Sequence, residues 1–221
     1  MPRSFAALTG TLICTALGLL LFYAPQVEHQ NWPYLVAMVP FAVILDLMEL
    51  ELPDRLRFSL VSAVHLVALI LFGIPTAVWV AALSGAAGEL LRDVPPVSVV
   101  YNTCQAVVAV ATAGYAFQFL GGEVGPGFGQ PLIALVAVGV YLVVNSLAVA
   151  AAYRTRFGRP YLQSLRTLLS GQPVMTYLLG QVIGLVGVYF ALRQEWIYLA
   201  FVGGLILLTR QAFQSYLDLY R

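Results

Sequence analysis

Long apolar runs follow one another along almost the whole chain and are separated only by short polar connections. Of the 221 residues, 61% are hydrophobic and 10% are charged, whereas about 25% of residues are charged in an ordinary soluble domain. A water-soluble fold cannot bury that much apolar surface. In a bilayer, apolar runs of about 17 to 25 residues cross as helices because every backbone group must be hydrogen-bonded internally. The sequence therefore predicts an all-α, polytopic transmembrane helix bundle that forms one integral membrane domain over residues 1–221.

We count about eight membrane segments, with six to eight as the range. The second, third, fourth and eighth segments have only about 14 to 16 residues, which is short for a full crossing. Such segments thin the bilayer, borrow flanking polar residues or enter the membrane without crossing it. The predicted segments are 5–23, 33–48, 58–72, 75–90, 99–120, 131–153, 174–192 and 196–209.

The third and fourth segments are separated only by the residues around Gly73 and Pro75. Proline removes a backbone donor and disfavours helix at the residue before it. An unbroken helix over residues 58–90 would be about 50 Å long at 1.5 Å per residue. We therefore predict a tight helical hairpin, and the alternative is one long kinked helix.

The arginines predict the orientation, because cytoplasmic loops of membrane proteins are rich in basic residues. The chain contains no Lys, so all eleven basic residues are Arg. With eight segments, ten of them fall on the side of both termini and only Arg193 falls on the other. This division predicts a protein of the bacterial inner membrane with cytoplasmic N- and C-termini, a cytoplasmic 154–173 segment, and periplasmic connections at 24–32, 121–130 and 193–195.

The longest polar connection forms a predicted cytoplasmic basic surface. It carries Arg154, Arg156, Arg159 and Arg166. Apolar residues recur at helical spacing over 161–169, so this stretch is either an interfacial amphipathic helix that touches anionic headgroups or a basic loop that only sets topology. A net charge of +1 offers no basic surface for nucleic acid, and that class of partner is excluded.

Polar residues inside apolar segments are costly and are candidates for a functional site. In the predicted topology most of them fall toward the cytoplasmic half and form a polar belt. The belt either binds a ligand or a proton, or consists of hydrogen bonds between helices together with solvated carboxylates. Asn102 and Gln105 share one helix face and are expected to point inward, as is Asn145. The belt residues are Asp46, Glu49, His65, Glu89, Asn102, Gln105 and Asn145.

No pattern predicts catalysis, a metal or a cofactor. His65 lacks a second histidine at a ligand spacing, and the other histidine, His29, falls on the opposite side of the membrane. The serines are scattered, so no Ser-His-Asp arrangement is specified. We expect a protein that is not an enzyme.

Several stretches together resemble a known family. They are the span ending in Glu49-Leu50-Glu51-Leu52-Pro53, the following "FSLVSAVHLVALILFGIPTAVWVAALSG", the later "YNTCQAVVAVATAGYAFQFLGG" and "NSLAVAAAYRTRFGRP", and the last segment running into "RQAFQSYLDLYR". This order is similar to the N-terminal multi-pass sensor modules of bacterial signalling proteins that carry HD-GYP, GGDEF or histidine kinase domains. The resemblance covers residues 46–221. It implies a sensing or scaffolding unit without its output domain, either a stand-alone relative or a portion of a longer protein.

Three functions remain open at the level of sequence. The first is a sensory or interaction module that couples a membrane event to a cytoplasmic signalling domain or another partner. The second is a small-molecule carrier resembling the substrate-binding membrane subunits of vitamin uptake systems, although a carrier favours polar residues near the midplane. The third is an accessory subunit that packs against other membrane subunits. Gly180, Gly184 and Gly187 predict a close helix contact, within the bundle or in a homodimer.

Overall fold

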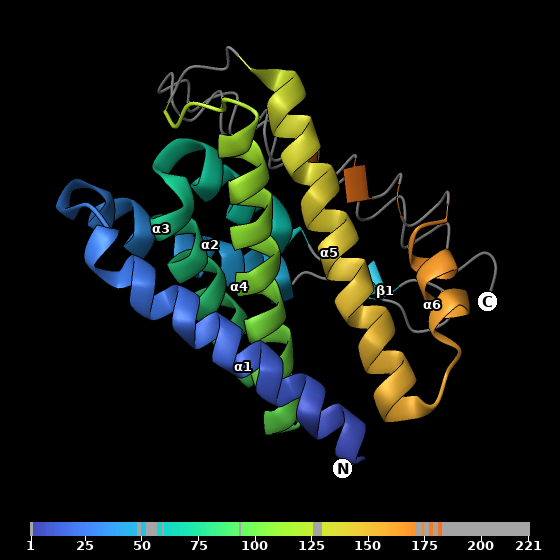
Figure 1. The fold of residues 1–221 in the computed structure, drawn as a ribbon. Helices are drawn as coiled ribbons and strands as arrows, with labels where there is room; N and C mark the ends of the chain where they lie inside the picture. The colour runs from blue at the N-terminus through green and yellow to red at the C-terminus, as the bar shows by residue number, and fades with distance from the viewer. Residues whose placement is uncertain are drawn as a thin grey trace.

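A computed structural model shows a predominantly helical protein (Figure 1). It describes residues 2–47, 50–51, 57–58, 60–92, 94–125, 130–170, 174, 177–178 and 181–182. The α-helices are α1 (Arg3–Tyr23), α2 (Trp32–Leu47), α3 (Val61–Leu91), α4 (Pro96–Phe119), α5 (Pro131–Phe157) and α6 (Tyr161–Leu168). Two 3-10 turns, η1 (Ala24–Gln26) and η2 (His29–Asn31), connect α1 to α2.

One short strand pair interrupts the helices. The strands β1 (Leu50–Glu51) and β2 (Arg57–Phe58) are antiparallel, and Leu50 pairs with Phe58 while Glu51 pairs with Arg57. The sequence predicted helices only, and a pair this short was not expected. It closes the connection between α2 and α3, so the end of α2 and the start of α3 lie at the same end of the bundle.

Proline and glycine mark the helix boundaries. Helices α4 and α5 begin at Pro96 and Pro131, where a missing N–H has no cost because the first turn leaves its N–H groups unpaired. Helix α5 ends at Gly158, which has a left-handed φ of 68°. The N–H groups of Gly158 and Arg159 then donate to the carbonyls of Arg154 and Tyr153, a Schellman-type ending. The chain leaves α5 sharply and enters α6.

Helix α3 forms the centre of the bundle. It packs against α2 and α4, and α4 in turn packs against α1 and α5. About two-thirds of the apolar window of α3 is buried inside the protein, compared with 17% for α1 and 28% for α5. The outer helices therefore present apolar side chains such as Leu21 and Leu132 outward, as expected for surfaces solvated by lipid.

The predicted hairpin is confirmed, because α3 reverses direction at Gly73. Its φ of 80° and ψ of 178° are not helical and are accessible in practice only to glycine. The His65 ring lies 3.0 Å from the Ser84 hydroxyl, although a continuous helix would separate these two residues by about 28 Å. The two arms of α3 therefore run antiparallel, side by side, on either side of Gly73.

We expect Gly73→Ala to destabilise the protein by about 1 to 3 kcal/mol, because a Cβ atom is strained at this φ and ψ. Space is not the reason, since a Cβ there would meet Pro75 and Val124 only at ordinary contact distance, 3.6 Å. Gly10→Ala is the matched control, because a Cβ at Gly10 on α1 meets nothing within 4 Å. Unfolding midpoints in detergent compare the two variants, and equal midpoints would contradict the turn.

The helices alternate between two ends of the bundle. At one end, Arg156 of α5 donates to the Ser98 hydroxyl of α4 and lies over the Phe5 ring of α1. At the other end, the Tyr23 and Tyr115 hydroxyls are hydrogen-bonded and Gly125 donates to the Ile70 carbonyl beside the hairpin turn. We call these the arginine end and the turn end.

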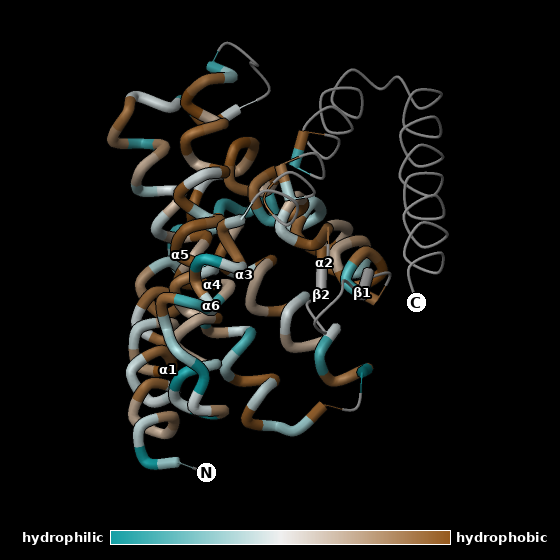
Figure 2. The backbone as a smooth tube through the Cα atoms, turned by 90° about the vertical axis from the view of Figure 1, so that its right-hand side faces the viewer, coloured by the Kyte–Doolittle hydropathy of each residue, from teal (hydrophilic) through white to brown (hydrophobic). Residues whose placement is uncertain are grey.

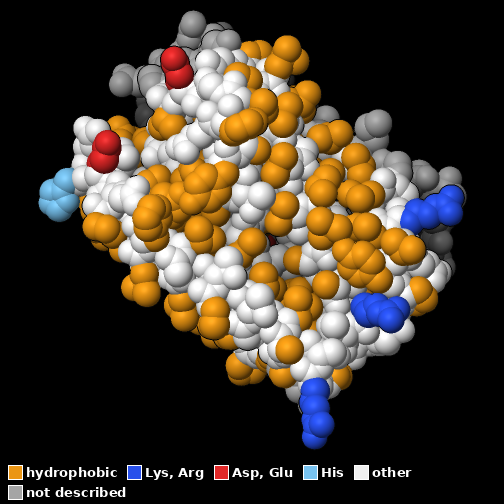
Figure 3. Space-filling view, viewed as in Figure 1, with side chains coloured by type: hydrophobic (Ala, Val, Ile, Leu, Met, Phe, Trp, Pro, Cys, Tyr) orange, Lys and Arg blue, Asp and Glu red, His pale blue; other side chains and the backbone are white. Residues whose placement is uncertain are grey.

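Charge separates along the same axis. Arg3, Arg92, Arg154 and Arg156 lie at the arginine end, and Glu28, His29 and Glu123 lie in the connections at the turn end. The face in Figure 3 shows blue side chains along its lower and right edges, red and pale blue side chains at the upper left, and apolar side chains between. Figure 2 shows apolar stretches along the helices and hydrophilic residues mostly near their ends. This distribution matches a bundle that crosses a bilayer.

The predicted count of about eight membrane segments is not supported. By length and composition, four helical stretches in the described part of the chain could cross a membrane: Arg3–Gln26, α3, α4 and α5, of which α3 is divided into two arms by the reversal at Gly73. Helix α2 has 16 residues, about 24 Å against a hydrocarbon core of about 30 Å. The first arm of α3, before Gly73, is shorter still. The predicted segments 174–192 and 196–209, with Gly180, Gly184 and Gly187, fall almost entirely outside the described residues.

Candidate functional site

A chain of buried polar side chains occupies the centre of the bundle. His65 on the first arm of α3 lies with its Nε2 atom 3.0 Å from the Ser84 Oγ on the second arm. Its Nδ1 atom lies 3.5 Å from the Tyr141 hydroxyl of α5. All three side chains are buried, with His65 1% exposed. The hairpin thus encloses an imidazole with a hydroxyl at each ring nitrogen.

The hydrogen bonds around Ser84 specify the form of this imidazole. Ser84 donates its only hydroxyl proton to the Val80 carbonyl at 2.7 Å, so its oxygen accepts from His65. His65 must then carry its proton on Nε2, and its Nδ1 accepts from the Tyr141 hydroxyl. A neutral histidine satisfies both contacts. This polarity is the reverse of a nucleophile–base pair, in which the hydroxyl donates to the imidazole.

Two residues beyond α6 extend the polar centre. The Tyr177 ring stacks on the Tyr141 ring, with centroids 6.3 Å apart and an interplanar angle of 16°. The Gln181 amide, which is buried, donates to the Ser62 hydroxyl at the start of α3 at 2.6 Å. The sequence placed Gln181 on a separate span. The structure brings it against the first arm of the hairpin.

A charged cluster closes the arginine end between three helices. Arg92, at the end of α3, pairs with the Asp46 carboxylate of α2 at 3.1 Å and lies 3.5 Å from the Glu89 carboxylate. Arg92 also donates to the Asp46 backbone carbonyl. Asn102 of α4 donates to Glu89 at 2.8 Å. We call Asp46, Glu89, Arg92 and Asn102 the charged cluster.

The charged cluster is enclosed rather than displayed on the surface. The side chains of Arg92 and Asp46 are only 11% and 9% exposed. Gly88 provides the room for this arrangement, since a Cβ atom at Gly88 would overlap the Asp46 carboxylate. The second arm of α3 joins the charged cluster to the buried His65 chain, because Ser84 lies on this arm and Glu89 and Arg92 lie at its end.

The predicted amide contacts are partly confirmed. Gln105 is buried on α4 and donates to the Asn145 side-chain oxygen of α5 at 2.7 Å. Asn145 is half-buried. Asn102 also makes a bond between helices, to Glu89 of α3, but it is exposed, so the prediction that it faces the interior is wrong. It lies in the second turn of α4, at the arginine end of the bundle.

The basic surface also has a definite arrangement. Arg154, Arg159 and Arg166 are exposed, whereas Arg156 is half-buried between Phe5 and Phe157 and its cation lies over both rings. Residues Tyr161–Leu168 form a helix, α6, which packs on α5, so the helical one of the two alternatives for this stretch is found. Leu162 on α6 is 76% exposed. The predicted residue Glu49 lies outside the described residues.

Sequence reasoning missed three central residues, Ser84, Tyr141 and Arg92. A signal for Ser84 was present, because His65 and Ser84 are nearly equidistant from the turn at Gly73 and Pro75 and so must lie opposite each other in a hairpin. Tyr141 gave no such signal, since tyrosine is also common at the surface of membrane helices. Arg92 was counted only as a topological charge.

The described belt residues therefore form three groups, one of which is the pair of Gln105 and Asn145. His65 lies with Ser84 and Tyr141 inside the hairpin, and Asp46, Glu89 and Asn102 lie around Arg92 at its open end. Among the residues that the structure describes, no three His, Cys, Asp or Glu side chains are placed to hold a metal ion. Comparison of the chain with protein-family models, with curated proteins and with solved structures found no match.

Proposed function

We propose that this chain is a non-catalytic sensory and interaction module of the bacterial inner membrane that couples an event in the membrane to a cytoplasmic partner. The observation that carries the proposal is that the second arm of α3 bears both Ser84, which contacts the buried His65, and Arg92, which holds the charged cluster at the arginine end. A movement of this arm inside the bundle therefore reaches one end of the molecule. The resemblance to N-terminal sensor modules points to the same class of function.

Three arguments support the proposed orientation, the proposed lack of catalysis and the proposed coupling. The arginines gather at the end that holds the charged cluster and the start of α1, as expected for a cytoplasmic face. The Ser84 proton is directed at a backbone carbonyl, so Ser84 is not activated as a nucleophile. Packed polar networks with two arrangements are a known means of coupling distant sites.

The test uses the full chain in its native membrane, with a photo-crosslinking amino acid at position 162, where Leu162 is exposed at the arginine end. We expect a discrete adduct with a cytoplasmic protein, and we expect Tyr141→Phe to change its yield several-fold, because this variant removes the hydroxyl that contacts His65. Thr112→Val is the matched control, since the exposed Thr112 hydroxyl donates only to the Val108 carbonyl.

The outcomes separate the alternatives. If the adduct forms with the same yield in Tyr141→Phe and Thr112→Val, an accessory subunit is favoured. Such a subunit binds its partner without responding to the buried His65 chain. The absence of any protein adduct at position 162, with the chain present at its normal level in the membrane, overturns the interaction module. A small molecule that raises the melting temperature of the purified chain would then favour the carrier.

A further inference from the structure

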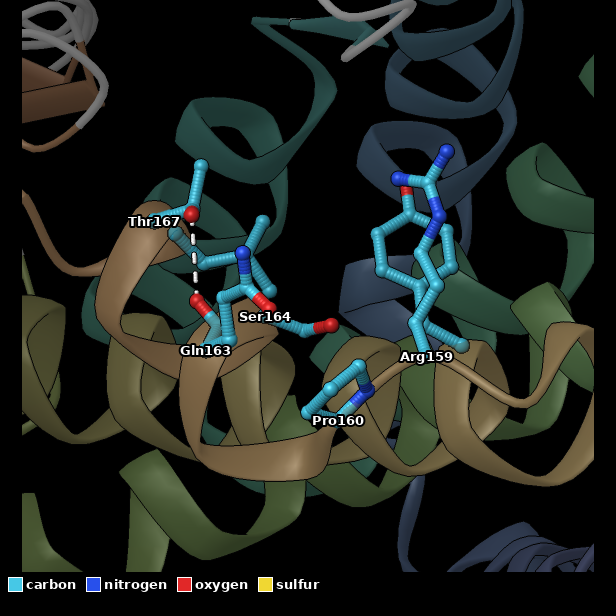
Figure 4. Close-up of a pocket in the computed structure, with 7 residues that line it drawn as sticks. Arg159, Pro160, Gln163, Ser164 and Thr167 are labelled. Atoms are coloured by element: carbon cyan, nitrogen blue, oxygen red, sulfur yellow. Dashed lines mark hydrogen bonds between the residues drawn. The ribbon is translucent and has the colours of Figure 1, made fainter.

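A pocket of about 330 Å³ lies where α5 ends and α6 begins. It is lined by Tyr153 of α5, by Arg159 and Pro160 in the connection, and by Gln163, Ser164 and Thr167 of α6 (Figure 4). The Gly158 turn creates this geometry, because it folds α6 back beside α5 and leaves Arg159 at the rim. The pocket is distinct from the charged cluster and from the His65 chain.

Leu168 completes the lining, which contains an arginine and several polar side chains but no carboxylate. The Arg159 guanidinium lies over the Tyr153 ring at 5.4 Å from its centroid, and within the described chain no acidic side chain pairs with it. The first turn of α6 contains no acidic residue. Its N–H groups, which lack helical acceptors, add a positive partial charge at the same place.

Ser164 is the second and independent indication of a ligand. Its residue surface is only 8% exposed, and its hydroxyl makes no hydrogen bond to any described residue. Figure 4 shows this hydroxyl pointing from α6 into the space toward Arg159, whereas the Thr167 hydroxyl is already used on the Gln163 carbonyl. A hydroxyl that lines the pocket without a protein partner is available to bond to a ligand there.

We infer that this pocket binds a phosphate group, held by the Arg159 guanidinium, the Ser164 hydroxyl and the N–H groups at the start of α6. Arginine and helix N-termini are the donors that recognise phosphate. The pocket lies at the arginine end of the bundle. A phosphate there comes either from the headgroup of an anionic phospholipid or from free phosphate, and the test distinguishes these two sources. This inference goes beyond partner coupling and stands independently of it.

The test titrates the full chain in mild detergent with phosphatidylglycerol and follows bound lipid by native mass spectrometry and by the melting temperature. We expect Arg159→Gln to weaken the apparent affinity about tenfold and Ser164→Ala about threefold, because each removes a donor to the phosphate. Arg166→Gln is the matched control. It removes the same charge from α6 outside the pocket lining and should stay within about twofold.

Two further arms decide between sources and keep the inference open to refutation. If inorganic phosphate displaces phosphatidylglycerol, the site is one for free phosphate. If inorganic phosphate does not displace the lipid and diacylglycerol does not bind, the site is one for the lipid headgroup. Either result supports a phosphate site. Three outcomes overturn the inference. Arg159→Gln and Arg166→Gln lose the same affinity for phosphatidylglycerol, diacylglycerol binds as tightly as phosphatidylglycerol, or neither phosphatidylglycerol nor inorganic phosphate binds. Ser164→Ala keeps the test valid where the arginine variant loses its fold.

Discussion

Arg92→Met is expected to lower the free energy of unfolding by about 3 kcal/mol, because it leaves the Asp46 carboxylate enclosed without its counter-ion. The two side chains are about nine-tenths buried, and an enclosed charge that loses its partner retains most of its desolvation cost. Glu89 loses the same cation, at 3.5 Å. Unfolding in detergent, followed by tryptophan fluorescence, measures the loss.

Two comparison variants give this result its meaning. Arg154→Met removes an exposed arginine from the same end of the bundle and should cost less than about 0.5 kcal/mol. Combining Arg92→Met with Asp46→Asn should restore part of the stability, since no uncompensated carboxylate then remains at position 46. A loss as small as that of Arg154→Met would show that water screens the charged cluster and that it does not hold the three helices together.

The helical hairpin could be predicted from the sequence because its cause is local. Proline at position 75 cannot continue the helix from position 71, and glycine at position 73 accepts the positive φ that the reversal requires. The amphipathic α6 was predictable for the same reason, since its apolar spacing is contained within nine residues. In both cases neighbouring residues determine the conformation.

The number of crossings could not be predicted, because apolarity does not distinguish a helix surrounded by lipid from one surrounded by protein. Helix α3 is as apolar as α5, yet it is mostly buried in the bundle, while α5 exposes one face. Helix length carries the missing information, and α2 and the first arm of α3 are too short to span the hydrocarbon core. The short lengths of these segments could be read from the sequence. The distribution of the arginines nevertheless favoured counting each segment as a crossing.

The charged cluster lay beyond sequence reasoning for a different reason. Asp46 and Arg92 are 46 residues apart and meet only because the hairpin returns the end of α3 to the end of α2. Their pairing depends on the small residue Gly88, whose role appears only when the two helices are placed together. Asp46 could be identified as a candidate from the sequence, whereas Arg92 could be identified as its partner only from the folded structure.

Close packing against the hairpin should make Gly114, the one glycine of α4, intolerant of any side chain. A Cβ atom at this position would lie 2.5 Å from the Ile74 Cγ1 and 2.8 Å from the Leu69 Cδ1, well inside contact distance. Leu69 and Ile74 flank the turn and are both buried, so neither can swing away without opening the hairpin. We expect Gly114→Val to destabilise the protein by about 3 kcal/mol through overpacking.

Gly139→Val is the matched control, because it makes the same change within helix α5, where a Cβ atom meets nothing within 4 Å. The difference between the two unfolding midpoints then measures packing alone, since helix propensity changes equally in both. In a Gly114→Ala background, Ile74→Ala should recover stability by removing the atoms that the new methyl group meets. Equal midpoints for Gly114→Val and Gly139→Val would mean that α4 does not pack against the turn, and the hairpin would lose the contact that holds it at the centre of the bundle.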